Sequence, residues 1–530
     1  MYEFFMFADR KSSAAFWIGS LLVVIGVLLH IPMFLMGASM HYMLAGMPMD
    51  NGMLWGMAAI IGGAGAAAFG LQPKEASASA LSHHERIVPP EDAPLTLWHW
   101  LAGAALAAAL VIDIMKPASL GFVTPGMKVE YGVDAPTVSL LPFCALMGTA
   151  LGSFIWGYLA DLYGRRATIL LSAVMFVGTS ICGAMPSFTW NLIMCFLMGL
   201  SAGGMLPVAY ALLAEIMPTR HRGWALVVVG GIGAVGGYLA ASGLSALLQP
   251  VFGWRIMWFL NLPSGLILIA LSPLIPESAR FLMHIGRPDE ALATLKRFGS
   301  VIVTETEDWD EEAKLDHSHL PPVDRRFIGA TVALTVAALS WGFVNFGLLL
   351  WLPGELISEG RDMGVAAAII ARSSFIAIPV VAVAALLYAR WSTKGALLTM
   401  IAITAAGLAA VMLRQSGLPA VSDPVIEIAL LIIGSTGVIS ILLPYTAENY
   451  PLRIRGRATG WVAGCSKAGG LLCQGLSTLA LVPSIGVAAA AIGLSSLLGL
   501  ALVAFYGRET RGRDLRELER STTAAVVTGS

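Results

Sequence analysis

AEIMPTRHRG (residues 214–223) and AENYPLRIRG (residues 447–456) are two copies of one stretch in a chain of 530 residues. Six of the ten positions are identical, namely Ala, Glu, Pro, both Arg and Gly, and the offset is 233 residues. The match continues beyond the stretch, because Gly236 and Gly237 fall on Gly469 and Gly470 at the same offset. The repeat therefore predicts two similar halves, an organisation typical of secondary transporters.

The composition indicates an integral membrane protein. Hydrophobic residues make up 57% of the chain and charged residues 12%, against roughly 45–50% and about 25% in soluble domains. The net charge is −1, and no Lys/Arg block suggests nucleic acid. The five cysteines lie in apolar runs without a CxxC pair, which favours buried hydrophobic positions over disulfides.

Apolar runs long enough to cross a bilayer recur along the whole chain. The first run is too long for a signal peptide, so it is predicted to be a retained helix. Fourteen helices are expected, at residues 14–37, 52–72, 96–122, 135–160, 167–186, 188–215, 224–248, 255–275, 327–352, 365–389, 395–413, 424–446, 457–480 and 485–506. The fold class is therefore all-α, with two six-helix halves and two extra N-terminal transmembrane helices.

Charge placement predicts the orientation. With the N-terminus inside, all but seven of the 32 Lys and Arg residues fall on the cytoplasmic side, as the positive-inside rule requires. Both termini are then cytoplasmic in an inner or plasma membrane. The predicted division is 1–72 (extra helices), 73–95 (cytoplasmic linker), 96–275 (N-terminal half), 276–326 (cytoplasmic linker with a short amphipathic helix at RPDEALATLKRF and an acidic run), 327–506 (C-terminal half) and 507–530 (cytoplasmic tail).

Several loop motifs resemble those of the major facilitator superfamily, in particular its sugar-porter-like and organic-ion or metabolite:proton symporter branches. They are GYLADLYGRR (157–166), the two repeated stretches, GWR (253–255), PESARFL (276–282) and GRETRGRDLRELE (507–519). The resemblance covers about residues 96–520 and implies two six-helix halves that alternate in access to a central site. It also implies a cytoplasmic gate, for which the candidates are Gly157, Asp161, Gly164, Arg165, Arg166, Glu215, Arg222, Glu448, Arg453 and Arg455. Glycines at 157 and 164 suit tight turns and close helix approach, and positive-inside anchoring is the competing role for the charges.

Two departures from the family pattern weaken the prediction of a sugar substrate. The seventh core helix lacks the paired glutamines of sugar porters and offers Trp341 and Asn345 instead. The fourth core helix has Cys195 where the family usually has an arginine. The usual acid–arginine coupling pair is therefore incomplete.

Four ionisable residues lie within predicted spans: Asp113, Lys116, Arg372 and Lys467. Each costs roughly 2.5–3.5 kcal/mol near the bilayer centre unless it is paired or hydrated, so such residues are functional candidates. Three positive charges against one acid predict an anionic substrate, with Arg372 and Lys467 as its ligands. Tyr210, Trp341, Asn345 and Ser466 complete the predicted substrate-binding set. Snorkelling or a structural salt bridge is the alternative for both bases.

The stretch VIDIMKPASLGF (111–122) places an acid and a base three residues apart, before a helix-kinking Pro117. Asp113 and Lys116 share a helix face and can form a salt bridge. We expect Asp113 to carry the proton and Lys116 to replace the missing arginine. A purely structural pair is the alternative.

Residues 30–57 are rich in methionine and include His30, Met36, Met40 and His41. Thioether and imidazole ligands suit copper(I), although adaptable packing is the simpler interpretation. No function is assigned to the two extra helices, for which docking on the core, oligomerisation and partner binding all remain open.

The leading prediction is a proton-coupled carrier that imports a small organic anion or carboxylated metabolite. It needs no cofactor beyond the proton gradient, and its partners are a small molecule and the lipid bilayer. The alternatives are a sugar or polyol:proton symporter, a copper or other metal transporter, and a non-transporting nutrient sensor. No nucleophile–base arrangement or phosphate loop suggests an enzyme. Substrate identity, coupling ion, direction and oligomeric state are not predicted.

Overall fold

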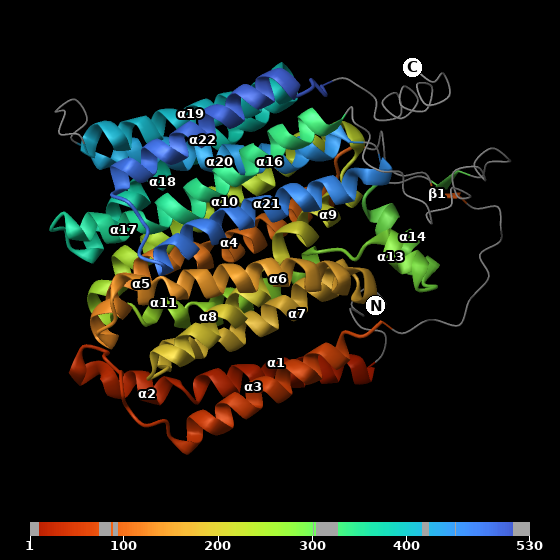
Figure 1. Cartoon of the computed structure of the whole chain (residues 1–530). Coiled ribbons are helices and arrows are strands. Elements are labelled where there is room, and N and C mark those ends of the chain that lie inside the picture. The colour runs from red at the N-terminus through yellow and green to blue at the C-terminus, as the bar shows by residue number, and fades with distance from the viewer. Residues whose placement is uncertain are drawn as a thin grey trace.

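The computed structural model describes residues 10–73, 86–87, 94–299, 302–303, 327–415, 423–450 and 452–511. Nearly all of these residues are helical, and the one pairing of strands described joins β1 (Arg86–Ile87) to β2 (Ile302–Val303) in antiparallel register. The predicted all-α architecture is confirmed (Figure 1). We call the end of the bundle that carries β1, α13 and α14 the linker end, and the opposite end the far end.

The chain begins with a hairpin that is separate from the two halves. It consists of α1 (Arg10–Leu28), α2 (Ile31–Met36), the 3₁₀ turn η1 (Gly37–Met40) and α3 (Asn51–Gly70). The two long helices approach closely, because a Cβ on Gly19 would lie 2.5 Å from the carbonyl oxygen of Gly63. The hairpin packs on α7 at one edge of the bundle (Figure 1).

The N-terminal half contains six spans, four of which are interrupted by short breaks. Its elements are α4 (Leu97–Tyr131), α5 (Ala135–Val138), α6 (Leu140–Tyr163), α7 (Arg165–Gly178), η2 (Thr179–Ala184), α8 (Phe188–Ala202), α9 (Met205–Ile216), α10 (Thr219–Phe252), α11 (Ile256–Phe259), α12 (Asn261–Leu271) and η3 (Ser272–Leu274). The span predicted to end at residue 122 continues to Tyr131, because α4 accommodates both Pro117 and Pro125.

Two short helices follow at the linker end, α13 (Ala279–His284) and α14 (Pro288–Arg297). The second confirms the helix predicted at RPDEALATLKRF, and it has Asp289 and Glu290 in its first turn and Lys296 and Arg297 in its last. The Arg297 guanidinium lies 3.9 Å from the ring centre of Trp98 at the start of α4. The acidic run predicted in this segment falls outside the described residues.

The C-terminal half repeats the six-span pattern. Its elements are α16 (Ile328–Phe343), the π-helical turn η5 (Val344–Leu348), α17 (Leu349–Ser358), α18 (Met363–Leu386), the π-helical turn η6 (Leu387–Trp391), α19 (Thr393–Gln415), α20 (Pro424–Asn449), α21 (Leu452–Thr478) and α22 (Ile485–Tyr506). Thirteen spans within the described residues are long and apolar enough to cross a membrane. The more polar α21 occupies the place of the remaining predicted helix.

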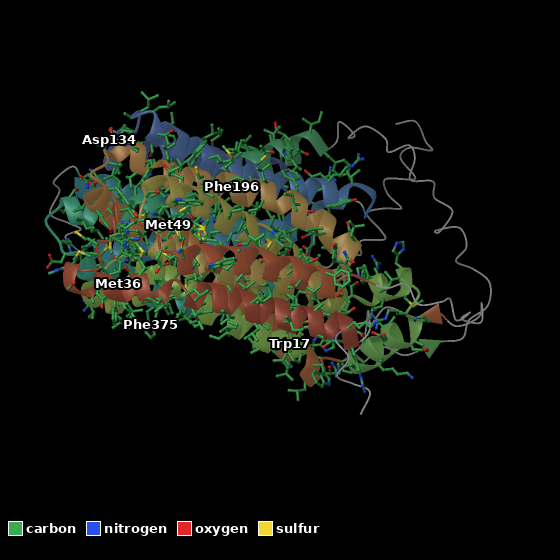
Figure 2. The ribbon with its side chains drawn as sticks, turned by 90° about the horizontal axis from the view of Figure 1, so that it is seen from below. Trp17, Met36, Met49, Asp134, Phe196 and Phe375 are labelled. Carbon is green, nitrogen blue, oxygen red and sulfur yellow. The ribbon has the colours of Figure 1, made fainter. Side chains whose placement is uncertain are left out.

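The two halves meet along several helix pairs. α10 packs on α18 and α20, α4 packs on α17, and α6 packs on α21. The outer surface carries large apolar side chains such as Trp17 (50% exposed) and Phe375 (67%), which project from the bundle in Figure 2. Such a surface suits lipid contact, and the inter-half contacts place the middles of α4 and α21 near the centre of the bundle.

Candidate functional site

Asp113 lies midway along α4 and is half-buried. Its Oδ1 atom is enclosed, yet it has no hydrogen-bond partner among the residues that the structure describes. An unpaired buried carboxylate oxygen is costly, so this atom is available to a proton, a water molecule or a substrate. The charge that interacts with it is on the other half of the molecule.

Lys467 on α21 interacts electrostatically with Asp113. The two side chains form no ion pair within 4.0 Å in the described structure. The Lys467 ammonium instead lies 5.0 Å from the ring centre of Phe346, in a cation–π arrangement. An acid of one half and a base of the other therefore interact across the two halves without a direct ion pair in the described structure.

Lys116 does not pair with Asp113, contrary to the sequence prediction. Its side chain is only 2% exposed, and its Nζ donates a hydrogen bond to Asn261 Oδ1 on α12 and lies 4.7 Å from the ring centre of Phe176. Three residues turn a helix by 300°, so the two side chains are about 60° apart and reach different neighbours. The Lys116 amine therefore belongs to the interior of the N-terminal half, where Asn261 also donates to Thr179 Oγ1 at 3.0 Å.

Arg372 does not line the centre of the molecule either. It is exposed on α18, on the same face as Phe375 (67% exposed) and Ile376 (49%). No hydrogen bond or ion pair to Arg372 is found within the described residues. The sequence gives only its depth in the span, whereas the direction of the side chain depends on which face packs inward. Of the four ionisable residues predicted within spans, Asp113 and Lys467 are therefore the two that interact with each other across the halves.

The π-helical turn η5 shapes the wall beside Lys467. Such a turn displaces backbone carbonyls from their usual helical partners, and neighbouring side chains supply donors. The hydroxyl of Tyr238 on α10 lies 3.1 Å from the Asn345 carbonyl oxygen and 3.0 Å from Asn345 Oδ1. Gln474 Nε2 donates to the Phe346 carbonyl oxygen at 2.5 Å. Tyr238 thus connects the N-terminal half to this turn, a role that the sequence did not suggest.

The other predicted substrate ligands are mostly engaged in helix packing. Trp341 Nε1 donates to the carbonyl oxygen of Ser435 at 2.7 Å, and Ser466 Oγ donates to that of Ala463 at 2.7 Å. The hydroxyl of Tyr210 is packed against Gly230, on the side of α10 near Ser440. Cys195, which occupies the usual arginine position, is fully buried and interacts with the Cys182 thiol.

The gate candidates of the N-terminal half come together at the linker end. The Arg165 guanidinium lies 3.4 Å from Asp161 and 3.4 Å from Glu215. Glu277, which was not selected from the sequence although it lies in PESARFL, accepts hydrogen bonds from the backbone N–H groups of Arg165 at 2.7 Å and Arg166 at 3.2 Å. These contacts join the start of α7 to α6, α9 and the segment after η3.

The two glycines of this motif differ. Gly164 has φ +95°, and a Cβ there would lie 2.5 Å from the Glu277 carboxylate. A Cβ on Gly157 would meet nothing within 4 Å, so the close approach expected there is absent. Arg222 Nη2 donates to the Met217 carbonyl oxygen at 3.5 Å.

The C-terminal half has a comparable cluster at the same end. Glu448 Oε2 accepts a hydrogen bond from Thr510 at 2.6 Å. Glu509, in GRETRG, accepts hydrogen bonds from Ser392 and from the backbone N–H of Thr393. An acid after the last helix of each half was the sequence signal that could have revealed Glu277 and Glu509. The side chains of Arg453 and Arg455 lie outside the described residues.

The candidate copper ligands do not form a shared site. His30 is fully buried and its Nδ1 atom lies 2.8 Å from the Gly26 carbonyl oxygen, whereas Met36 (54% exposed, labelled in Figure 2) and Met40 (45%) face outward. His41 is also exposed. No cluster of three His, Cys, Asp or Glu residues suited to a metal ion occurs in the described parts of the chain.

Two six-helix halves that pack against each other along long apolar spans have the architecture of a membrane carrier. Comparison with known proteins agrees, since the model of the Major Facilitator Superfamily matches residues 101–474. The chain belongs to this superfamily and is a multi-pass membrane transporter rather than an enzyme.

Its relatives include transporters from bacteria. The niacin transporter NiaP of Acinetobacter baylyi is 25% identical over 439 residues, which cover 81% of this chain and 98% of that protein. A putative niacin/nicotinamide transporter of Bacillus subtilis is 26% identical over 408 residues, covering 76% and 95%. The synaptic vesicle 2-related protein of Pongo abelii is 26% identical over 453 residues, covering 79% and 80%.

The solved structures that resemble the chain have the same fold. The proton:xylose symporter XylE bound to 6-bromo-6-deoxy-D-glucose superposes with a TM-score of 0.63 at 17% identity, covering 80% of this chain and 98% of that one. A partially occluded inward-open form of XylE from E. coli gives 0.62 at 15% identity, covering 79% and 100%. These likenesses concern the fold alone.

Proposed function

We propose that the chain is a proton-coupled carrier that imports a small organic anion, with the linker end and both termini in the cytoplasm of a plasma-membrane protein. One observation carries this proposal: Asp113 of one half and Lys467 of the other interact electrostatically, while no ion pair within 4.0 Å joins them in the described structure. The basic residues of the linkers support the orientation through the positive-inside rule.

The pair explains how an anion and a proton travel together. In the empty carrier, Asp113 and Lys467 balance each other's charge. A substrate carboxylate that binds the Lys467 ammonium takes over its positive charge, and Asp113 then favours the protonated form because its counter-charge is engaged. The carrier with anion and proton has the same net charge as the empty carrier, so neither state leaves an uncompensated charge inside the membrane.

The surroundings of Lys467 favour a flat, aromatic carboxylate. The Phe346 ring is buried beside the ammonium, so the charge lies in aromatic surroundings of the kind that suit an aromatic ring. Two bacterial relatives are named niacin transporters, and niacin is an aromatic carboxylic acid. A sugar fits less well, because the polar head of Asn345 is engaged by Tyr238 and the seventh core helix lacks the paired glutamines of sugar porters.

The linker-end clusters supply the gate. Arg165 bridges Asp161 and Glu215 in one half, while Glu448 bonds Thr510 in the other. Each cluster is internal to its half, so rocking moves it as a unit and brings its surface toward or away from the other half. The halves approach each other here, since a Cβ on Gly223 of α10 would lie 3.1 Å from the Glu448 carboxylate. We assign these clusters to the cytoplasmic gate.

Uptake into proteoliposomes tests the proposal. Radiolabelled nicotinate is supplied with and without an inward proton gradient, with nicotinamide, benzoate and xylose as competitors. We expect gradient-driven uptake that benzoate inhibits and that the neutral amide and the sugar do not. Lys467→Met should abolish uptake, and Asp113→Asn should abolish accumulation while leaving exchange of internal for external substrate. The exposed Lys128 on the same protein supplies the matched control, Lys128→Met.

Two results would overturn parts of the proposal separately. Uptake at the same rate with and without the proton gradient would contradict the proposed proton coupling. Competition by nicotinamide as strong as that by benzoate would contradict the proposal that the carrier recognises a carboxylate.

A further inference from the structure

A single carboxylate at the far end connects the N-terminal hairpin to the transport core. Glu130 is the penultimate residue of α4 and is almost fully buried, with a side chain 3% exposed. Its Oε1 accepts hydrogen bonds from the backbone N–H groups of Leu44 at 2.6 Å and Ala45 at 3.0 Å, both from the hairpin loop. Its Oε2 accepts one from Trp254 Nε1 at 2.8 Å.

Arg255 completes this cluster, and all five of its N–H donors have partners. Nε and Nη2 bond the two oxygens of Glu130 at 3.2 and 2.6 Å, and Nη2 also lies 2.9 Å from the Tyr131 hydroxyl. Nη1 donates to the carbonyl oxygens of Gly183 at 3.1 Å and Met185 at 2.9 Å. A fully buried ion pair is stable only with such complete bonding, so the connections at the far end of the N-terminal half form one rigid unit.

The hairpin loop is held in an unfavourable shape against this unit. His41 (φ 54°) and Tyr42 (φ 60°) both have left-handed backbone conformations without being glycine, which persists only where the surroundings impose it. Two further contacts between the hairpin and the N-terminal half help to hold the loop in this conformation. The Gly46 N–H donates to the Pro186 carbonyl oxygen at 3.0 Å, and the Phe34 ring lies 4.9 Å from that of Phe259.

The helix that ends in Glu130 needs support in its outer half. Pro117 and Pro125 interrupt its internal hydrogen bonding. This weakened part forms one of the contacts between the halves toward the far end, where Gly121 packs so closely on α17 that a Cβ would lie 2.8 Å from the Leu350 carbonyl oxygen. The buried Leu350 side chain belongs to the core cluster that is otherwise built from the N-terminal half and the hairpin.

We infer that the N-terminal hairpin is a brace for the outer gate. Its loop holds the end of α4 through Glu130, and α4 in turn seals the far end against Leu350 and Pro353 of α17. Loss of the two loop hydrogen bonds loosens the seal without changing the central site. This role as a brace rests on the proposed carrier function only in that opening of the far end is taken to admit substrate.

The test measures opening directly, without substrate or protons. In a variant whose five cysteines are replaced by alanine, Leu350→Cys places a thiol in the seal, and its reaction with a membrane-impermeant maleimide is timed. Ala45→Pro then removes one donor to Glu130, and the exposed position 45 tolerates the ring. Ala45→Gly keeps the N–H and is the matched control. A hydrogen bond to a charged group is strong enough that we expect labelling to be about threefold faster or more in Ala45→Pro.

The two outcomes are distinct. Faster labelling in Ala45→Pro than in Ala45→Gly, with the same elution profile in detergent, supports the brace. Equal labelling rates in the two variants overturn it, even where thermal stability falls, because the hairpin then only adds stability. Neither result depends on nicotinate uptake, so failure of the brace and failure of the proposed substrate are distinguishable.

Discussion

Glu277 and Glu509 occupy equivalent positions in the two halves. Glu277 follows the last span of the N-terminal half and accepts the backbone N–H of Arg165, where α7 begins, at 2.7 Å. Glu509 follows α22 and accepts the backbone N–H of Thr393, where α19 begins, at 3.0 Å. Each carboxylate therefore stands at the N-terminus of the third core helix of its half, where free N–H groups and the helix dipole favour an anion.

The surroundings of the two acids differ, and this predicts opposite responses to pH. Burial acts to raise the pKa of Glu509, but hydrogen bonds from Ser392 and Thr393 outweigh it and lower the pKa from 4.5 to about 2. The charged form is thus favoured by folding, and the stability it adds is present above pH 4.5 and lost as the pH falls toward 2. We expect Glu509→Gln to lower the melting temperature near neutral pH, and the deficit to shrink in acid.

The pKa of Glu277 is shifted in the opposite direction. Burial raises its pKa above 4.5, although hydrogen bonds from Ser278, Arg165 and Arg166 oppose the shift. Folding then favours the protonated form, so this contribution is present below pH 4.5 and declines as the pH rises through the raised pKa. Melting curves of Glu277→Gln and the wild type across the same pH range should diverge in the opposite sense. Parallel curves for both variants would contradict the assignment.

The two glycines of the GYLADLYGRR stretch, Gly157 inside α6 and Gly164 directly after it, allow a matched comparison of stability. Gly164 has φ 95° and ψ 162°, a region that is essentially restricted to glycine, and its missing Cβ makes room for Glu277. Gly164→Ala should therefore cost roughly 1–3 kcal/mol from backbone strain alone. Gly157→Ala should be neutral or stabilising, because space is open there and alanine is favoured in helices. Thermal unfolding in detergent compares the two, and equal losses would be inconsistent with the geometry.

The fold was predictable because each span repeats a simple physical requirement. A membrane helix needs a long apolar run, and α22 (Ile485–Tyr506) coincides with its predicted range for that reason. Loop composition marks the ends of the spans, and the repeated stretch shows that the halves are related. Where proline lies inside a span, as at Pro125 in α4, the prediction ended too early, because surrounding helices permit a proline that an isolated helix would not.

The site was less predictable because it depends on side-chain direction. Asp113 and Lys116 are neighbours in sequence, but Lys116 turns toward Asn261. Lys467, from the other half, is the base that interacts electrostatically with Asp113, and no local pattern connects residues so far apart in sequence. The sequence predicts the charge of each residue and its position along a membrane span. Which face of each helix points to the interior depends on the packing of the helices.

Tyr238 offers a test of the contact between the halves at η5. Its hydroxyl lies 3.0 Å from Asn345 Oδ1 and is the polar link from α10 to this turn. Tyr238→Phe removes the hydroxyl and leaves the ring, so we expect a loss of roughly 0.5–1.5 kcal/mol in thermal unfolding. Tyr158→Phe, at a residue that is 68% exposed, is the control and should have no effect. A Tyr238→Phe protein as stable as the control would mean that this hydrogen bond does not hold the halves together.

The sequence and the structure make different predictions about substrate binding by Arg372, whereas they agree on Lys467. Both were expected to bind the anion, but Arg372 shares the lipid-facing side of α18 with Phe375. Arg372→Leu should leave the KM of nicotinate uptake within about twofold and should not lower thermal stability, since a charge facing lipid costs about 2.5–3.5 kcal/mol. Lys467→Gln keeps a polar side chain but removes the charge, and should raise the KM by about tenfold or more, because hydrogen bonds to charged groups contribute roughly 1.5–3 kcal/mol. Uptake kinetics of the two variants at equal protein density decide the matter, since a large effect at Arg372 requires that its side chain reach the central site.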